Sequence, residues 1–93
     1  MIILNEKDSD KNEKLAKIIG ALIKIERKRA SYTQKRLAEE ALIHPNYVRE
    51  IEKGKKYVTV IILYRICNVL GIGISDFFQE VEKMILKEEI IFI

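Results

Sequence analysis

A chain of 93 residues has room for one domain with one hydrophobic core. Its 48% hydrophobic and 33% charged residues are typical of a globular protein. The single cysteine, Cys67, excludes an internal disulfide, and together with the single histidine, His44, it excludes a Cys/His zinc finger of ordinary ligand count. We expect no metal and no cofactor. Because so short a chain usually needs a disulfide, a metal or a partner subunit, oligomerisation is the expected support.

Positive charge is concentrated in the middle of the chain. Residues 24–56 carry an excess of five positive charges and residues 76–93 an excess of three negative ones, within a net charge of +3. This distribution suits a polyanion-binding face set apart from an interaction face, and an ordinary lysine-rich surface is the equally weighted alternative. The apolar start, residues 1–4, is too short for a signal core, and the densest apolar run, residues 58–63, is too short for a membrane span. We therefore expect a soluble cytoplasmic protein.

Helical periodicity dominates the chain and predicts an all-α fold of five helices. Residues 1–10 are predicted as a partly disordered or strand-like lead-in, residues 11–87 as the domain, and residues 88–93 as an apolar tail. The first helix is predicted over 11–29, from apolar residues that recur every three or four positions. Those residues are Leu15, Ile18, Ile19, Leu22 and Ile23.

Two short helices are predicted next. Thr33 is a good N-cap for a helix with Leu37, Ala38 and Ala41 facing inward, and residues 42–44 form a turn. Pro45 suits the first position of the following helix, since its fixed φ fits there and its missing N–H is not needed. Gly54 is expected to end that helix in a left-handed conformation. The helix is therefore predicted over 45–53.

The fourth and fifth helices complete the predicted domain. Thr59 caps a helix over 60–70 that ends at Gly71, with an inward stripe of Val60, Leu63, Cys67 and Leu70. Ser75 opens the fifth helix and puts Asp76 in its first turn, where the helix dipole favours an acid. The β-branched ends, residues 1–4 and 90–93, are predicted as short strands that pair with each other within or between subunits.

The segment that indicates a function is residues 33–54. It holds two helices joined by a turn too short for a long antiparallel hairpin. The apolar residues of the second helix, Val48 and Ile51, lie on one side. The other side projects outward and carries Asn46, Arg49, Glu50 and Lys53. Amide and guanidinium groups on such a face match the donors and acceptors of base edges in the major groove. Lysines on either side would meet phosphates.

These residues resemble the phage-repressor and Cro type of helix-turn-helix, the XRE family. The resemblance is carried by Thr33-Gln34-x-x-Leu37-Ala38, by Val48-x-x-Ile51-Glu52-Lys53-Gly54, by Thr59-Val60-x-x-Leu63-x-x-Ile66-Cys67-x-x-Leu70-Gly71-Ile72 and by Asp76-x-Phe78. It covers residues 15–78. The run His44-Pro45-Asn46-Tyr47 is also similar to the restriction-modification controller proteins within that family.

The resemblance implies a role for each matching position. Base readout falls to Asn46, Arg49 and Glu50, and backbone contacts fall to Gln34, Lys35, Tyr47, Lys53 and Lys55. Arg27 and Glu52 correspond to a structural ion pair between the first and third helices. Alternatives remain open at Glu50, which could instead pair with Lys53 or Lys35 within the protein.

Two departures from the family pattern matter. Leu42 stands where the family often has glycine in the turn, so this position must avoid a left-handed conformation or accept strain. Pro45 stands at a common base-reading position, where a proline offers only van der Waals contact. Specificity should therefore depend on the three readout residues that follow it.

The fourth helix is more apolar than one buried face requires, which indicates a second apolar surface. We expect a homodimer through Ile61, Ile62, Ile66, Val69 and Phe78; coverage of these residues by the fifth helix and tail is the alternative. A dimer would present two reading helices one DNA turn apart, about 34 Å, to a palindromic operator. The expected function is thus a sequence-specific transcription regulator that binds double-stranded DNA. The alternatives are a protein-interaction module of the same fold and a DNA-binding antitoxin. No nucleophile–base pair, metal cluster or phosphate loop favours an enzyme.

Overall fold

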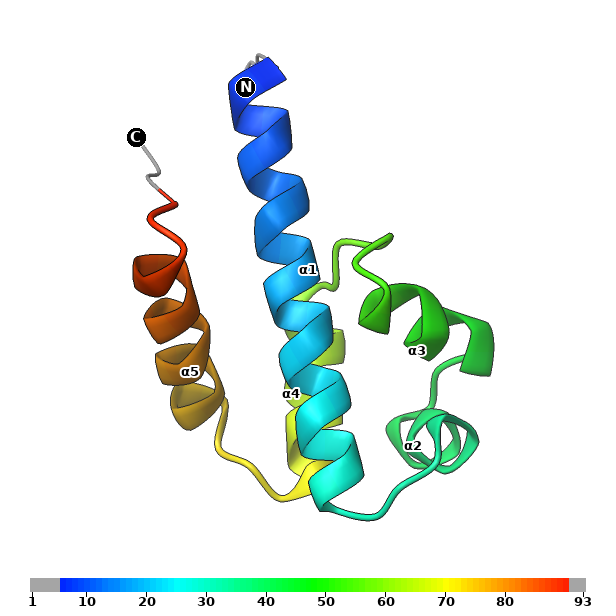
Figure 1. Cartoon of the computed structure of the whole chain (residues 1–93). Helices are drawn as coiled ribbons and strands as arrows, with labels where there is room; N and C mark the ends of the chain where they lie inside the picture. Colours follow the sequence, from blue (N-terminus) through cyan, green and yellow to red (C-terminus); the bar gives the residue numbers. More distant parts are fainter. Residues whose placement is uncertain (1–5, 91–93) are drawn as a thin grey trace.

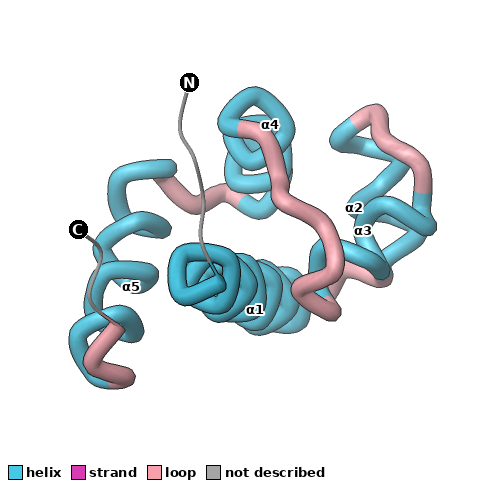
Figure 2. The backbone as a smooth tube through the Cα atoms, turned by 90° about the horizontal axis from the view of Figure 1, so that it is seen from above, coloured by secondary structure: helices cyan, strands magenta, loops and turns pink. Residues whose placement is uncertain are grey.

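The computed structural model describes residues 6–90, and within this range every regular element is a helix. The helices are α1 (Glu6–Arg29), α2 (Gln34–Ala41), α3 (Pro45–Glu52), α4 (Val60–Leu70) and α5 (Ile74–Lys87). Helix α1 forms the central column, with α5 on one side and the α2–α3 pair on the other (Figure 1). The view from above shows the same order, with α4 beside α1, between α5 and the α2–α3 pair (Figure 2). The all-α, five-helix prediction is confirmed.

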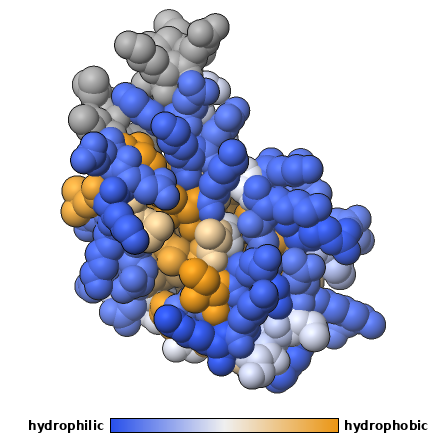
Figure 3. Space-filling view, in the orientation of Figure 1, coloured by the Kyte–Doolittle hydropathy of each residue, from blue (hydrophilic) through white to orange (hydrophobic). Residues whose placement is uncertain are grey.

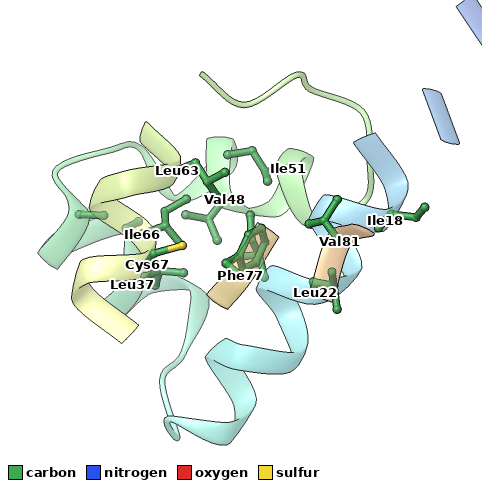
Figure 4. Close-up of a cluster of buried hydrophobic side chains, with 13 residues drawn as sticks. Ile18, Leu22, Leu37, Val48, Ile51, Leu63, Ile66, Cys67, Phe77 and Val81 are labelled. Carbon is green, nitrogen blue, oxygen red and sulfur yellow. The ribbon is translucent and has the colours of Figure 1, made fainter. Parts of the chain in front are cut away.

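The core lies where α1, α3, α4 and α5 meet. Phe77 of α5 is 1% exposed and lies in the middle of the buried cluster (Figure 4). Around it, every helix contributes aliphatic side chains; the labelled ones are Ile18, Leu22, Leu37, Val48, Ile51, Leu63, Ile66 and Val81. Each fully buried large side chain of this kind stabilises the fold by about 1.5–3 kcal/mol. The amphipathic pattern of each helix therefore fixes which faces meet.

A close crossing of α1 and α3 depends on Gly20. A Cβ atom on this residue would overlap the carbonyl oxygen of Ile51. Close backbone approach therefore requires glycine at this point of α1. The crossing sets how far the C-terminal end of α3 stands from α1.

The N-caps of α2 and α4 match the sequence prediction. The Thr33 hydroxyl accepts a hydrogen bond from the Arg36 amide at 3.0 Å, and the Thr59 hydroxyl accepts one from the Ile62 amide at 3.1 Å. His44 is the N-cap of α3, where its Nδ1 accepts from the Asn46 amide at 3.0 Å. Helix α4 ends at Gly71, whose φ of 74° is left-handed. These contacts satisfy amide groups that a helix end otherwise leaves unpaired.

Several predicted boundaries are wrong. Helix α1 begins at Glu6, not Lys11, and the helix dipole favours the acidic Glu6 and Asp8 in its first turn. The N-cap of α5 is Gly73 without a side-chain hydrogen bond, and not Ser75, although Asp76 does lie in the first turn. Helix α3 ends at Glu52, with Lys53 as its C-cap.

The strand-like ends fall largely outside the described residues, which exclude 1–5 and 91–93. The exception is Ile90, whose amide donates to the carbonyl of Ile85 at 3.1 Å and whose side chain packs against the core. This bond closes the end of α5. Ile90 is therefore part of a helix termination rather than of a strand.

The buried stripe of α4 is rotated relative to its prediction. Val60 was expected inward but is 68% exposed, whereas Ile66 was expected outward but is 1% exposed. The reason is that α4 packs against α1, α2 and α5 together, so its buried arc is wide and includes Leu63, Ile66 and Cys67. Within residues 6–90, no single helix is long and apolar enough to cross a membrane; α4 and α5 reach that length only as a pair bent by 108°.

Candidate nucleic-acid interface

Helix α3 has two chemically distinct faces. Val48 and Ile51 are 0% and 1% exposed and anchor the helix in the core. On the other side, Asn46, Arg49 and Lys53 are exposed and Glu50 is half-buried. The outward placement follows from the spacing, because positions 46, 49, 50 and 53 share one side of a helix. A polar, donor-rich face is thus held on a rigid support.

The turn before α3 contains a strained residue. Leu42 has φ 60° and ψ 44°, and its left-handed conformation lets the Ile43 amide donate to the Ala38 carbonyl at 2.9 Å. The left-handed region costs an L-residue about 1–2 kcal/mol. The side chain is 78% exposed and offers little packing in return. The sequence left two options for Leu42, to avoid the left-handed conformation or to accept its strain. The structure shows the strained, left-handed conformation.

A buried polar network joins α1, α2 and α3. Nε of Arg27 donates to Glu52 Oε2 at 2.7 Å, and Nη2 donates to Oε1 at 3.0 Å. The third guanidinium nitrogen, Nη1, donates to the Tyr32 carbonyl in the α1–α2 loop at 2.8 Å. The two side chains are 10% and 3% exposed. Charge-assisted, two-point contacts of this kind are both strong and directional, so they fix the angle of α3 on α1.

Gln34, expected at a phosphate, is part of the same network. Its Nε2 donates to Glu52 Oε1 at 3.0 Å, and the residue is half-buried. The Glu52 carboxylate therefore accepts from both Arg27 and Gln34. This contact ties the first residue of α2 to the last residue of α3. The sequence did not indicate it, because it depends on the packing of two helix ends that are 18 residues apart.

The three residues predicted to read bases have different surroundings. The Arg49 Nη1 donates to Asn46 Oδ1 at 2.6 Å, so these two side chains form one group on the exposed face. The alternative partners of Glu50 were Lys53 and Lys35, but the ion pairs of residues 6–90 join other side chains. Glu50 is therefore left as an acceptor on the α3 surface.

Lysines flank α3 as the sequence predicted. Lys53, Lys55 and Lys56 are exposed at and after the end of the helix, and Lys35 is exposed on α2. The loop that carries them is held against α1, since a Cβ on Gly54 would lie 2.9 Å from Cα of Lys17. Tyr47 is half-buried and packs on the core, with the rest of its ring available to solvent.

A surface cluster on α2 was missed by the sequence reasoning. The Arg36 guanidinium lies 3.9 Å from the ring centre of Tyr32, and its Nε donates to Glu40 at 2.7 Å. The Tyr32 hydroxyl also donates to Glu40, at 3.1 Å. The bond from Arg36 holds the pKa of the Glu40 carboxyl below its usual value. Spacings of four residues along the chain could have predicted this cluster.

Helix α4 and the start of α5 carry exposed apolar side chains. Ile61 is 70% and Phe78 40% exposed, and both belong to the predicted dimer surface. Ile62 and Val69 are half-buried, and Ile66 is in the core, so these three offer less or no surface. Val60 and Tyr64, 68% and 59% exposed, extend the patch instead. We call Val60, Ile61, Tyr64 and Phe78 the α4–α5 patch.

A second apolar region lies between α1 and α5, where orange side chains line a groove between hydrophilic ones (Figure 3). Its lining includes Ile18, Ala21, Leu22, Ile25 and Met84. By contrast, the α2–α3 half of the same view is mostly hydrophilic (Figure 3). Polar and apolar surfaces are thus separated on this face of the molecule.

A helix pair with a buried framework and a polar, lysine-flanked outer helix defines a helix-turn-helix DNA-binding domain. A family model described as Helix-turn-helix matches residues 23–77. The chain therefore belongs to the helix-turn-helix family of phage-repressor and Cro type, whose members are DNA-binding transcription regulators and not enzymes.

Solved structures of two regulators are similar to this chain. The clp gene regulator ClgR from Corynebacterium glutamicum is 28% identical, with a TM-score of 0.76 and coverage of 81% of this chain and 80% of that chain. The wild-type restriction-modification controller protein C.Esp1396I is 28% identical, with a TM-score of 0.72 and coverage of 77% and 95%. The same controller, as a tetramer in complex with its natural 35 base-pair operator, gives 28% identity, a TM-score of 0.71 and coverage of 77% and 95%. No curated protein sequence matches.

Proposed function

We propose that this protein is a transcription regulator that binds a palindromic operator as a homodimer, with α3 in the major groove. The observation that carries the proposal is the division of α3 into a fully buried apolar side and an outward side with an exposed amide, an exposed guanidinium and a half-buried carboxylate. Asn46, Arg49 and Glu50 are the groups that face the base edges. These are the side chains whose donors and acceptors match bases in the major groove.

Phosphate contacts come from the residues around this face. Lys35 at the start of α2, and Lys53 and Lys55 at the end of α3, are exposed and supply positive charge on either side. Gln34 and Tyr47 lie between the framework and the surface, and we assign them contacts to the backbone as well. Because such contacts carry no sequence information, they position the domain rather than select the site.

The homodimer is supported by the α4–α5 patch. Side chains as large as Ile61 and Tyr64 rarely stand exposed together on a monomer without a partner surface. The patch lies on other helices than the reading face, so two subunits joined there keep both α3 helices free. The similar controller C.Esp1396I is a tetramer on its operator, which supports an oligomeric mode of binding.

The test is to select bound duplexes from a random pool and from the DNA upstream of the gene, then to measure affinity by fluorescence anisotropy. The affinity should fall steeply as salt rises, since phosphate contacts release counterions. Arg49→Ala should lower specific binding by about 1–3 kcal/mol, and Lys55→Ala should reduce the salt slope by about 1 per contact. Lys87→Ala, which removes an exposed lysine from α5, is the matched control and should leave both quantities unchanged.

A protein-interaction module of the same fold is the second candidate. It is favoured by Pro45, which is half-buried at a position where other members hydrogen-bond to bases. This candidate predicts no selected sequence and no retention of any duplex at low salt. A DNA-binding antitoxin shares the proposed chemistry and would be distinguished by its genomic neighbour.

A further inference from the structure

Asn46 and Arg49 form a hydrogen-bonded pair on the face that we assign to DNA. Nη1 of Arg49 donates to Oδ1 of Asn46 at 2.6 Å across one turn of α3. The Asn46 backbone is itself fixed, because its amide donates to the Nδ1 of the His44 cap at 3.0 Å. An exposed arginine normally samples many side-chain conformations. Here the cap fixes the asparagine backbone, and the asparagine side chain accepts from the guanidinium.

The pair presents donors to an approaching base. One Nη1–H of Arg49 is used within the pair, and the other guanidinium N–H groups keep the fork geometry that matches two acceptors. The Asn46 carbonyl oxygen faces Arg49, so the free edge of its amide is the NH₂ group. Guanine offers two acceptors, O6 and N7, side by side in the major groove. The pair presents mainly donors and therefore fits guanine better than adenine.

We propose that Asn46 is a positioning residue that aims Arg49 at a guanine in each half-site, rather than an independent reader of adenine. The inference rests on the proposed function. Direct reading of adenine by Asn46 needs its Oδ1 to accept from the base and its Nδ2 to donate to it. In this structure Oδ1 is turned toward Arg49, whereas a two-point contact with adenine needs both Oδ1 and Nδ2 to be turned toward the base.

The DNA test measures affinity for every single-base variant of the selected site. Arg49→Ala should abolish the preference for guanine at one position of each half-site. Asn46→Ala should weaken the preference at that same position about threefold to tenfold, as expected for loss of one hydrogen bond. Asn46→Asp keeps an acceptor for Arg49 and should restore the guanine preference. Lys53→Ala, on the same face but outside the pair, should weaken all sequences alike.

A second measurement needs no DNA. Rotation about the Nε–Cζ bond of Arg49 should be slower in the wild type than in Asn46→Ala, as seen in nitrogen-detected NMR of the arginine side chains. Rotation of Arg29, which pairs with Glu26 on α1, is the internal control and should be the same in both proteins. Equal rotation rates of Arg49 in the two proteins would overturn the inference.

The DNA outcomes separate the two proposals. A wild-type protein that selects no sequence overturns the proposed function. A wild-type protein that selects a sequence, with Asn46→Ala relaxing an adenine at a different position and leaving the guanine preference intact, overturns only the positioning role. Failure of Asn46→Asp to restore the guanine preference also counts against that role.

Discussion

The guanidinium of Arg27 and the carboxylate of Glu52 meet through two hydrogen bonds, of 2.7 and 3.0 Å, that join the end of α1 to the end of α3. Both side chains are nearly inaccessible to water. Gln34 adds a third donor to the same carboxylate. Helix α3 is therefore oriented by three polar groups as well as by its apolar anchors.

Removal of one member of this ion pair should be severely destabilising. Arg27→Ala leaves the Glu52 charge buried with only Gln34 as a donor, and breaking a buried pair in this way costs about 3–5 kcal/mol. The free energy of unfolding from urea titration measures the effect. The matched control is Glu40→Ala, which breaks the exposed Arg36–Glu40 pair and should leave the midpoint almost unchanged. Equal effects of the two variants would contradict a structural role for Arg27.

Replacement of Leu42 should stabilise the protein. Leu42→Gly relieves a left-handed conformation that costs about 1–2 kcal/mol. Because glycine loses more chain entropy on folding, part of this gain is offset, and the net stabilisation should be about 1 kcal/mol. Little packing is lost, since the leucine is 78% exposed. Thermal and urea unfolding measure the change. The reverse substitution at a similar φ, Gly71→Ala, meets no atom within 4 Å and should destabilise through the backbone alone.

The crossing at Gly20 predicts a third effect. Gly20→Ala places a methyl group against the Ile51 carbonyl, so α1 and α3 must separate, which should cost several kcal/mol, at or above the upper end of the about 1–3 kcal/mol typical of overpacking. Gly73→Ala is the control, because its Cβ would meet only the Asp76 carboxylate, at 3.2 Å. If Gly20→Ala folds as stably as Gly73→Ala, the close crossing is not as described.

The α4–α5 patch predicts how the subunits dissociate. Ile61→Asp puts a charge into the proposed interface and should convert the dimer to a folded monomer with weaker operator binding, as measured by analytical ultracentrifugation and anisotropy. Leu86→Asp is the matched control, because Leu86 is 72% exposed on α5 but outside the patch. If Leu86→Asp dissociates the protein and Ile61→Asp does not, the interface lies elsewhere on the molecule.

Cys67 should be inert and should make stability depend on alkaline pH. Burial, with a smaller contribution from the Glu26 charge, raises the pKa of its thiol from 9.0 to about 11. The unfolded chain then loses the thiol proton before the folded one does, so stability is complete below pH 9 and falls as the pH rises towards 11. Cys67→Ala should flatten this part of the stability curve. A thiol reagent should react with native protein at pH 8 only as fast as the protein opens.

The number and order of the helices and the N-caps of α2 and α4 could be predicted from the sequence, because capping residues and apolar spacing act locally. Thr33, Pro45 and Gly54 each mark a boundary through their own chemistry. The start of α1 could not be placed, because residues 6–10 carry no apolar pattern. The burial of Ile66 and exposure of Val60 depended on how many helices surround α4, which is a property of the tertiary structure.

The candidate site was predicted in part. The outward placement of Arg49 follows from helix geometry alone, and so does that of Lys53. The contact of Gln34 with Glu52 and the pairing of Asn46 with Arg49 depend on side-chain conformations, which a sequence pattern does not specify. Sequence reasoning therefore located the face and its residue types but not the connections between them.

The separation of α3 into two faces also bears on how such a protein can be altered. Val48, Ile51 and Glu52 hold the helix in place, and Asn46, Arg49 and Glu50 make no contribution to the core. The three outward positions can therefore be randomised together in a library without loss of folded protein. One scaffold of this kind could be redirected to many target sequences, with its assembly and stability inherited unchanged.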